Sequence, residues 1–184
     1  MNFPSRVFLD TCSINFILEN GEQIFDGGQL RSSSNERERA DIEAFRNIFI
    51  VGQRASWQIA VSPNSYHEVS CTKDDRKRRY LESWFYEIWN YWQNSLRGDD
   101  NLLPASNMQI TSERRSITEI LKIIPDPADR ILICDAIKYK CDSFCTRDWK
   151  TILRYRGLMK CLKIEFITPF EWWSRLKPWA GIWA

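Results

Sequence analysis

Short hydrophobic runs alternate along this chain with longer segments in which apolar residues recur every three or four positions. A short apolar run is typical of a buried strand, and the longer spacing is typical of an amphipathic helix. The runs predict strands at residues 6–10, 57–61, 143–146 and 162–167. Helices are predicted at residues 14–20, 35–53, from 63, 76–96, 112–123, 127–140, 149–156 and from 168, with a loop over 21–35.

Strands that alternate with helices in this way favour a parallel sheet with helices on both faces. We therefore expect an α/β fold, an α/β/α sandwich with a central, mostly parallel sheet and extra helices. Ser62-Pro63 and Asp126-Pro127 each place a capping side chain before a proline, which predicts the start of a helix at both points. The length of 184 residues fits a single domain.

Composition excludes several kinds of chemistry. The chain has 26 basic and 24 acidic side chains, so its net charge of +2 is too small to bind nucleic acid without a local patch or a metal. His67 is the sole histidine, which excludes sites that need two or three imidazoles. Loops that cradle phosphate are absent as well. Without a secretory pattern or a membrane-spanning run, we expect a cytoplasmic protein with no membrane partner, whose six cysteines are buried thiols.

Carboxylates remain as the candidate chemistry. Asp10 and Asp148 directly follow predicted strands, whereas Glu68 and Asp129 lie near the starts of predicted helices. Ligands of open α/β sheets bind beyond the carboxyl ends of the strands, so these four acids can meet at one edge. Four negative charges together need a cation, and oxygen ligands favour Mg²⁺ or Mn²⁺. Such an ion activates water and stabilises charge on phosphate, which indicates phosphodiester hydrolysis.

Several segments, in this order along the chain, resemble PIN-domain nucleases: residues 7–11, 61–68, 129–136, 142–148 and 164–169. The resemblance implies a metal-dependent endoribonuclease that leaves a 5′-phosphate and a 3′-hydroxyl, with Mg²⁺ or Mn²⁺ as cofactor. It assigns the metal to Asp10, Glu68, Asp129 and Asp148. It also makes Thr146 the hydroxyl that orients the final aspartate, and Thr11 or Ser13 a helper near the first. The long segments around 21–54 and 76–123 are then helical insertions.

Asp135 leaves one assignment open, because it could replace Asp129. Six positions along a helix leave the two side chains roughly 120° apart, so they cannot both face one ion. The six-residue gap from Asp129 to Ala136 favours Asp129.

Each acid also has a plainer interpretation. Asp10 and Asp148 could cap a helix, Glu68 could be a solvated helix residue, and Asp129 could only favour the helix dipole. A haloacid-dehalogenase-like phosphatase needs a second aspartate two positions after the first, where this chain has Cys12.

Residues 138–163 hold eight basic side chains and two acidic ones. This excess predicts either a track for the RNA backbone or a solvated face. Arg147, Trp149 and Lys150, beside Asp148, are the predicted RNA contacts.

Two classes of function follow. In the first, the chain is a ribonuclease, either a toxin of a toxin–antitoxin or defence system or a stand-alone RNA-processing enzyme. In the second, it is a catalytically inactive PIN-like module that binds RNA or protein. The expected partners are RNA, an antitoxin or another protein, and a second copy of the chain in a homodimer.

Overall fold

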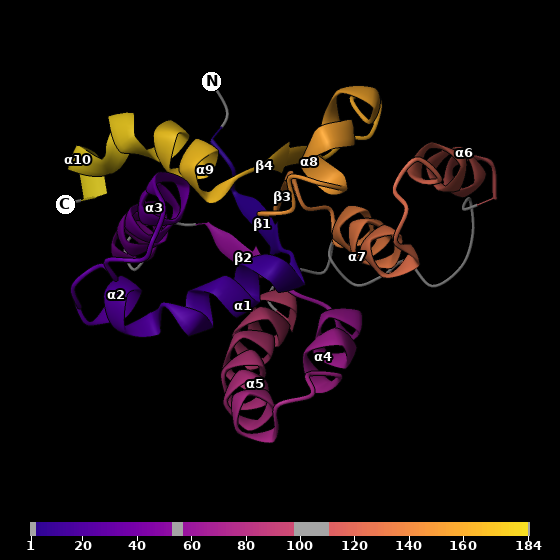
Figure 1. Ribbon diagram of the computed structural model, residues 1–184. Coiled ribbons are helices and arrows are strands. Elements are labelled where there is room, and N and C mark those ends of the chain that lie inside the picture. The colour runs from indigo at the N-terminus through magenta and orange to yellow at the C-terminus, as the bar shows by residue number, and fades with distance from the viewer. Residues whose placement is uncertain (1–2, 53–56, 98–110, 184) are drawn as a thin grey trace.

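An all-parallel sheet of four strands lies at the centre of the parts of the chain that the computed structural model describes, residues 3–52, 57–97 and 111–183 (Figure 1). The strands are β1 (Arg6–Leu9), β2 (Gln58–Ala60), β3 (Ser143–Cys145) and β4 (Glu165–Ile167), in the order β2-β1-β3-β4. Phe8 of β1 pairs with Ala60 on one side and with Phe144 on the other. The four predicted strands are therefore confirmed, and each is shorter than its hydrophobic run.

Helices occupy the segments between and after the strands. Between β1 and β2 lie α1 (Thr11–Glu19), α2 (Gly21–Phe25) and α3 (Glu36–Gly52). Between β2 and β3 lie α4 (Pro63–Ser70), α5 (Asp75–Arg97), α6 (Thr111–Leu121) and α7 (Pro127–Lys138). After β3 come α8 (Ile152–Tyr155) and the 3₁₀ turn η1 (Arg156–Leu158). After β4 come α9 (Pro169–Leu176), the 3₁₀ turn η2 (Lys177–Trp179) and α10 (Ala180–Trp183).

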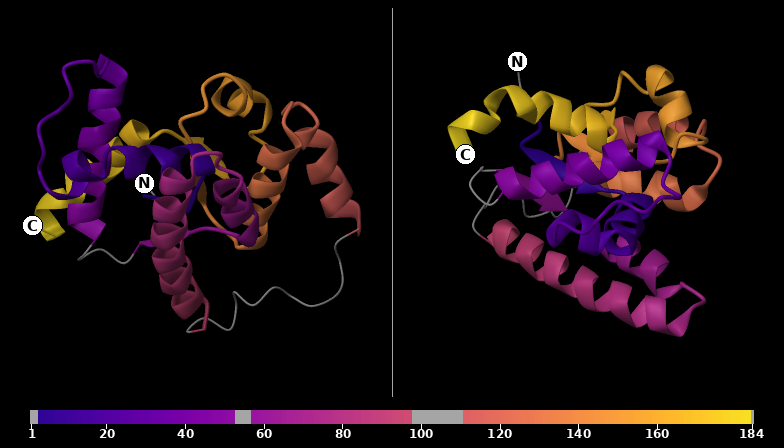
Figure 2. Two further views of the ribbon diagram at one scale, coloured as in Figure 1. Left: turned by 60° about the horizontal axis from the view of Figure 1, so that its bottom comes forward. Right: turned by 60° about the vertical axis from the view of Figure 1, so that its left-hand side comes forward.

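The helices flank the sheet on two sides, as the sequence predicts. In Figure 1, α3 and α9 lie to the left of the strands and α7 and α8 to the right. α3 packs against α9, whereas α7 contacts β3 and α8 contacts β4. α5 is a single long helix that packs on β2 and lies beside the shorter α4 (Figure 2). No helix within the described ranges is long and apolar enough to cross a membrane.

Local hydrogen bonds explain where the helices start. The Ser62 side chain accepts the N–H of Ser65, and the Asp126 side chain accepts the N–H of Ala128, so both predicted caps are confirmed. α1 begins at Thr11, earlier than the predicted residue 14, because the N–H groups of residues 13 and 14 already donate to the Asp10 carbonyl.

The predicted loop over 21–35 is wrong at its start, because residues 21–25 form α2 and bury Ile24. Both long segments between the motifs contain helices: α2 and α3 lie in the first, whose residues 26–35 form the predicted loop, and α5 and α6 lie in the second. The predicted helix end at Gln53 and residues 98–110 lie outside the described residues.

Aromatic side chains link neighbouring strands in the core. The Phe8 and Phe144 rings stack with centroids 5.5 Å apart, and the Phe144 and Phe166 rings lie 5.7 Å apart. Trp92 of α5 and Trp172 of α9 are fully buried. These contacts hold β1, β3 and β4 in register, and they therefore support the backbone at the carboxyl ends of β1 and β3.

We predict that Phe144→Ala lowers the free energy of unfolding by about 3–5 kcal/mol, because it leaves a cavity between two strands. Urea denaturation measures the loss. Phe170→Ala is the matched control, because that side chain is 54% exposed and should change stability little. Equal losses in the two variants would contradict this account of the core.

Candidate functional site

Asp10 is a buried carboxylate at the carboxyl end of β1. It is 2% exposed, and its N–H donates to the Cys145 carbonyl at 3.1 Å. Its Oδ2 accepts hydrogen bonds from the Thr146 hydroxyl at 2.6 Å and from the Cys12 thiol at 2.8 Å. Burial raises the pKa of Asp10, and these two hydrogen bonds act in the opposite direction. The side chain is therefore held rigidly beside the ends of β1 and β3.

Cys12 is a part of this site that sequence reasoning missed. Burial, and then the charge of Asp10, raise the pKa of the Cys12 thiol well above its usual range, so the thiol stays protonated and can donate. Its sulfur also accepts the Arg147 N–H at 3.3 Å. The position two residues after Asp10, at the start of a helix, was the available signal.

The expectation of buried thiols is only partly confirmed. All six cysteines are free, and two of them, Cys141 and Cys145, are buried. Cys12 is half-buried, whereas Cys71, Cys134 and Cys161 are exposed.

Asp148 belongs to a tight turn that follows β3. Its Oδ1 accepts the N–H groups of Lys150 at 2.8 Å and Thr151 at 3.0 Å, and its own N–H donates to Thr146 Oγ1 at 3.0 Å. The predicted helix from Trp149 is wrong at its start, because this turn replaces the first helical residues and α8 begins at Ile152. Thr146 thus connects Asp10 to the backbone of Asp148.

A second threonine connects two of the predicted acids. The Thr151 hydroxyl donates to Asp148 Oδ2 and lies 3.4 Å from Asp129 Oδ2. Its contact with Asp129 joins the turn after β3 to the first turn of α7. Nothing in the sequence pattern indicates this role, because it depends on the turn around Asp148.

Glu68 approaches the same edge from α4. Burial raises its pKa, the nearby Thr11 hydroxyl lowers it, and the charges of Asp10 and Asp126 raise it further. The Thr11 Oγ1 is itself buried and makes no hydrogen bond of good geometry. An unsatisfied buried hydroxyl beside a carboxylate is costly unless a ligand completes its surroundings.

Asp129 shows most directly that the acids converge. Burial raises its pKa to about 7, together with the charges of four other carboxylates: Asp10, Asp126, Asp148 and Glu68. These five acids come from four segments of the chain, since Asp126 caps the helix that carries Asp129, and we call them the acidic cluster. Asp126 was predicted only as a helix cap, yet its charge acts on both Asp129 and Glu68.

The chemistry of the acidic cluster fits a divalent cation. Its donors are oxygens, its charges repel one another, and the Thr11 hydroxyl beside it is unsatisfied. No three His, Cys, Asp or Glu side chains in the described ranges are already close enough to hold a metal ion. A bound cation would neutralise the repulsion between these carboxylates.

Two of the predicted auxiliary residues point elsewhere. The Asp135 carboxylate accepts a hydrogen bond from the Asn64 amide at 2.7 Å. Ser13 is fully buried and donates to the Cys145 carbonyl at 3.2 Å, which is a contact within the fold. Asp135 and Ser13 thus each make a contact within the fold, and the choice of Asp129 over Asp135 as a metal ligand stays a prediction.

Of the three predicted RNA contacts, Arg147 is paired inside the fold, whereas Trp149 and Lys150 lie on the surface. Arg147 Nε donates to Asp41 Oδ2 at 2.7 Å, and the arginine side chain is only 20% exposed. Its guanidinium lies over the Phe16 ring, 3.4 Å from the centroid. Arg147 therefore pairs with Asp41 inside the fold, and its contact with RNA stays a prediction. Trp149 and Lys150 are exposed.

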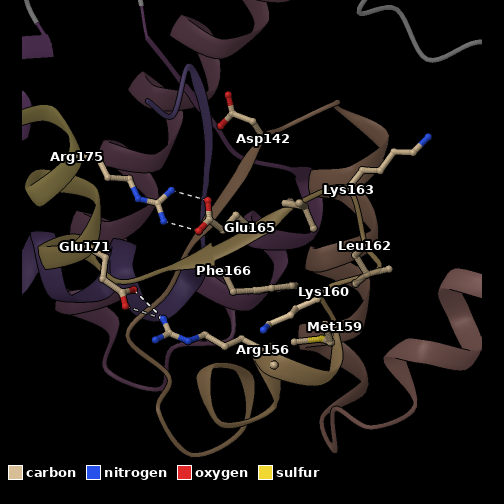
Figure 3. A pocket seen from close by; sticks show the side chains of 12 residues that line it. Asp142, Arg156, Met159, Lys160, Leu162, Lys163, Glu165, Phe166, Glu171 and Arg175 are labelled. Atoms are coloured by element: carbon tan, nitrogen blue, oxygen red, sulfur yellow. Dashed lines mark hydrogen bonds and ion pairs between the residues drawn. The ribbon is translucent and has the colours of Figure 1, made fainter. Parts of the chain in front are cut away.

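A cavity of about 660 Å³ lies along β4 and is separate from the acidic cluster (Figure 3). Two ion pairs lie at its wall, Arg156 with Glu171 and Arg175 with Glu165. None of the site residues predicted from the sequence lines this cavity.

We predict that Asp129→Asn stabilises the metal-free protein at high pH. With a pKa of about 7 instead of 3.8, folded Asp129 keeps a proton over a pH range in which the unfolded chain has lost it. This contribution to stability is present at low pH and disappears as the pH rises through about 7.

In chelator at about pH 8, Asp129→Asn should therefore have the higher Tm, and its Tm should fall less than that of the wild type as the pH rises from about 5. Scanning calorimetry measures both quantities. Asp135→Asn, on the same helix, is the control and should follow the wild-type profile. An unchanged profile for Asp129→Asn would disprove the electrostatic coupling.

Comparison of the chain with protein-family models found no match. Comparisons with curated proteins and with solved structures also found no similar protein. The findings identify an α/β fold with four parallel strands, and no family.

Proposed function

We propose that this protein is a metal-dependent endoribonuclease that holds Mg²⁺ or Mn²⁺ in the acidic cluster. The observation that carries the proposal is the pKa of Asp129, which burial, three carboxylates from other segments and the neighbouring Asp126 raise to about 7. Clustered carboxylates with strongly perturbed pKa values are common at functional sites, because folding alone does not favour such repulsion. The resemblance to PIN-domain nucleases points in the same direction.

Asp10, Glu68, Asp129 and Asp148 would hold the ion. When bound, a divalent cation supplies a Lewis acid for the phosphate and lowers the pKa of water. Cys12 and Thr146 position Asp10 by donating to its Oδ2. Thr151 positions Asp148 and lies next to Asp129.

The RNA backbone would approach along the exposed basic side chains that follow Asp148, beginning with Lys150. The small net charge of the chain makes such local contacts necessary. Within this function, we propose a toxin restrained by an antitoxin as the first biological role, and a stand-alone RNA-processing enzyme as the second.

A catalytically inactive module that binds RNA or protein is the second candidate function. One observation favours it: within the described ranges, no three potential ligands are already close enough to hold a metal ion. The two candidates differ in whether added metal produces cleavage.

We predict that purified protein cleaves RNA with Mg²⁺ or Mn²⁺, and that Asp10→Asn lowers the rate by roughly 100-fold or more, because it removes a charged ligand. Gel analysis of labelled RNA measures the rate, and a thermal melt checks that the variant is folded. Asp135→Asn should retain most of the activity, because its carboxylate contacts Asn64.

Cleavage that persists in chelator would overturn the metal mechanism. RNA binding without cleavage at any tested metal concentration would favour the inactive module.

A further inference from the structure

One face of α3 contacts the residues on both sides of Asp148. Arg37 and Asp41 are one turn apart on this helix and therefore lie on the same face. Asp41 pairs with Arg147, and the Arg37 guanidinium lies over the Trp149 ring, 4.4 Å from the centroid. The first long segment of the chain thus reaches the turn that carries part of the acidic cluster.

Trp149 is held between two fixed points. On one side, buried Asp41 accepts a hydrogen bond from Arg147 Nε at 2.7 Å. On the other side, the Asp148 carboxylate accepts the N–H groups of Lys150 and Thr151. The backbone at Trp149 is therefore well defined, although its side chain projects outward.

The Trp149 side chain is exposed although its backbone lies in a hydrogen-bonded turn. The indole is 42% exposed, and its neighbours Arg37 and Lys150 are exposed as well. An exposed indole held in place offers a flat surface on which a base can stack with little loss of side-chain freedom. A guanidinium at the same ring adds a stacking plane and a positive charge.

We propose that Trp149 and Arg37 form a platform for an unpaired nucleobase of single-stranded RNA, beside the acidic cluster. This inference rests on the proposed function, because it names the form of RNA that the same site would take. Bases in a duplex are stacked on both sides, so they reach such a platform only after unpairing. The platform therefore selects single-stranded RNA, and Lys150 contacts its backbone.

RNA affinity is measured on the Asp10→Asn protein, which does not degrade the RNA. The measurement therefore reports the platform separately from catalysis. Fluorescence anisotropy with a labelled single-stranded oligonucleotide should show that Trp149→Ala weakens binding roughly 5- to 100-fold. Trp149→Phe should keep most of the affinity, because it retains an aromatic ring. Trp179→Ala is the matched control, because Trp179 is also 42% exposed but lies in η2.

An abasic nucleotide placed at successive positions in the RNA tests for stacking directly. With Trp149 present, one position should weaken binding. In the Trp149→Ala protein, removing the base at that position should cause no further loss of affinity, because the two changes remove the same interaction. A duplex of the same sequence should bind more weakly, with little further effect of Trp149→Ala.

Equal affinities of the Trp149→Ala and Trp179→Ala proteins for single-stranded RNA would overturn the platform, while cleavage by the wild type would leave the proposed function intact. Additive effects of the abasic site and Trp149→Ala would also overturn it. A wild-type protein that neither binds nor cleaves RNA would disprove the proposed function itself.

Discussion

Repulsion between carboxylates at one edge of the sheet is the constraint on which the arrangement of this site depends. A parallel sheet brings the carboxyl ends of β1 and β3 together, and α4 and α7 add acids from the segments between them. Asp10 is tolerated there because a thiol and a hydroxyl donate to its Oδ2. In the described residues Asp129 has only the Thr151 hydroxyl, 3.4 Å away, as a donor, and burial followed by the repulsion raises its pKa. Such a cluster lowers stability in the absence of a cation, and that cost is typical of functional sites.

Support for the acidic cluster comes from neutral groups as well as from charges. Thr146 connects Asp10 to the backbone of Asp148, and Thr151 lies between Asp148 and Asp129. These hydroxyls fix the acids without neutralising them, so the negative potential is retained. α3 adds a second level of support through the buried pair of Asp41 and Arg147. The long segment that carries α3 therefore contributes to the site.

The strands and the main helices were predictable because burial imposes a regular spacing on apolar residues. The same spacing put Asp10 and Asp148 after strands and Glu68 and Asp129 on helices, and the structure brings these four acids into one electrostatic group. Short elements were less predictable. α2 lies at the start of a segment rich in glycine and serine, which predicts a loop. The turn at Asp148 replaces helical residues because its carboxylate accepts two backbone N–H groups.

The sequence by itself determined the α/β class, the order of the elements and which acids follow strands, because these properties depend on local spacing and on burial. Only the tertiary structure decided which polar groups meet. Arg147 is a surface cation by sequence, yet its partner Asp41 lies 106 positions away along the chain. Cys12 and Thr151 each have a local hydrogen bond to an acid, but packing alone brought Cys12 to Thr146 and Arg147 and Thr151 to Asp129. Hydrogen-bond partners far apart in the sequence are set by packing, and a local pattern carries no information about them.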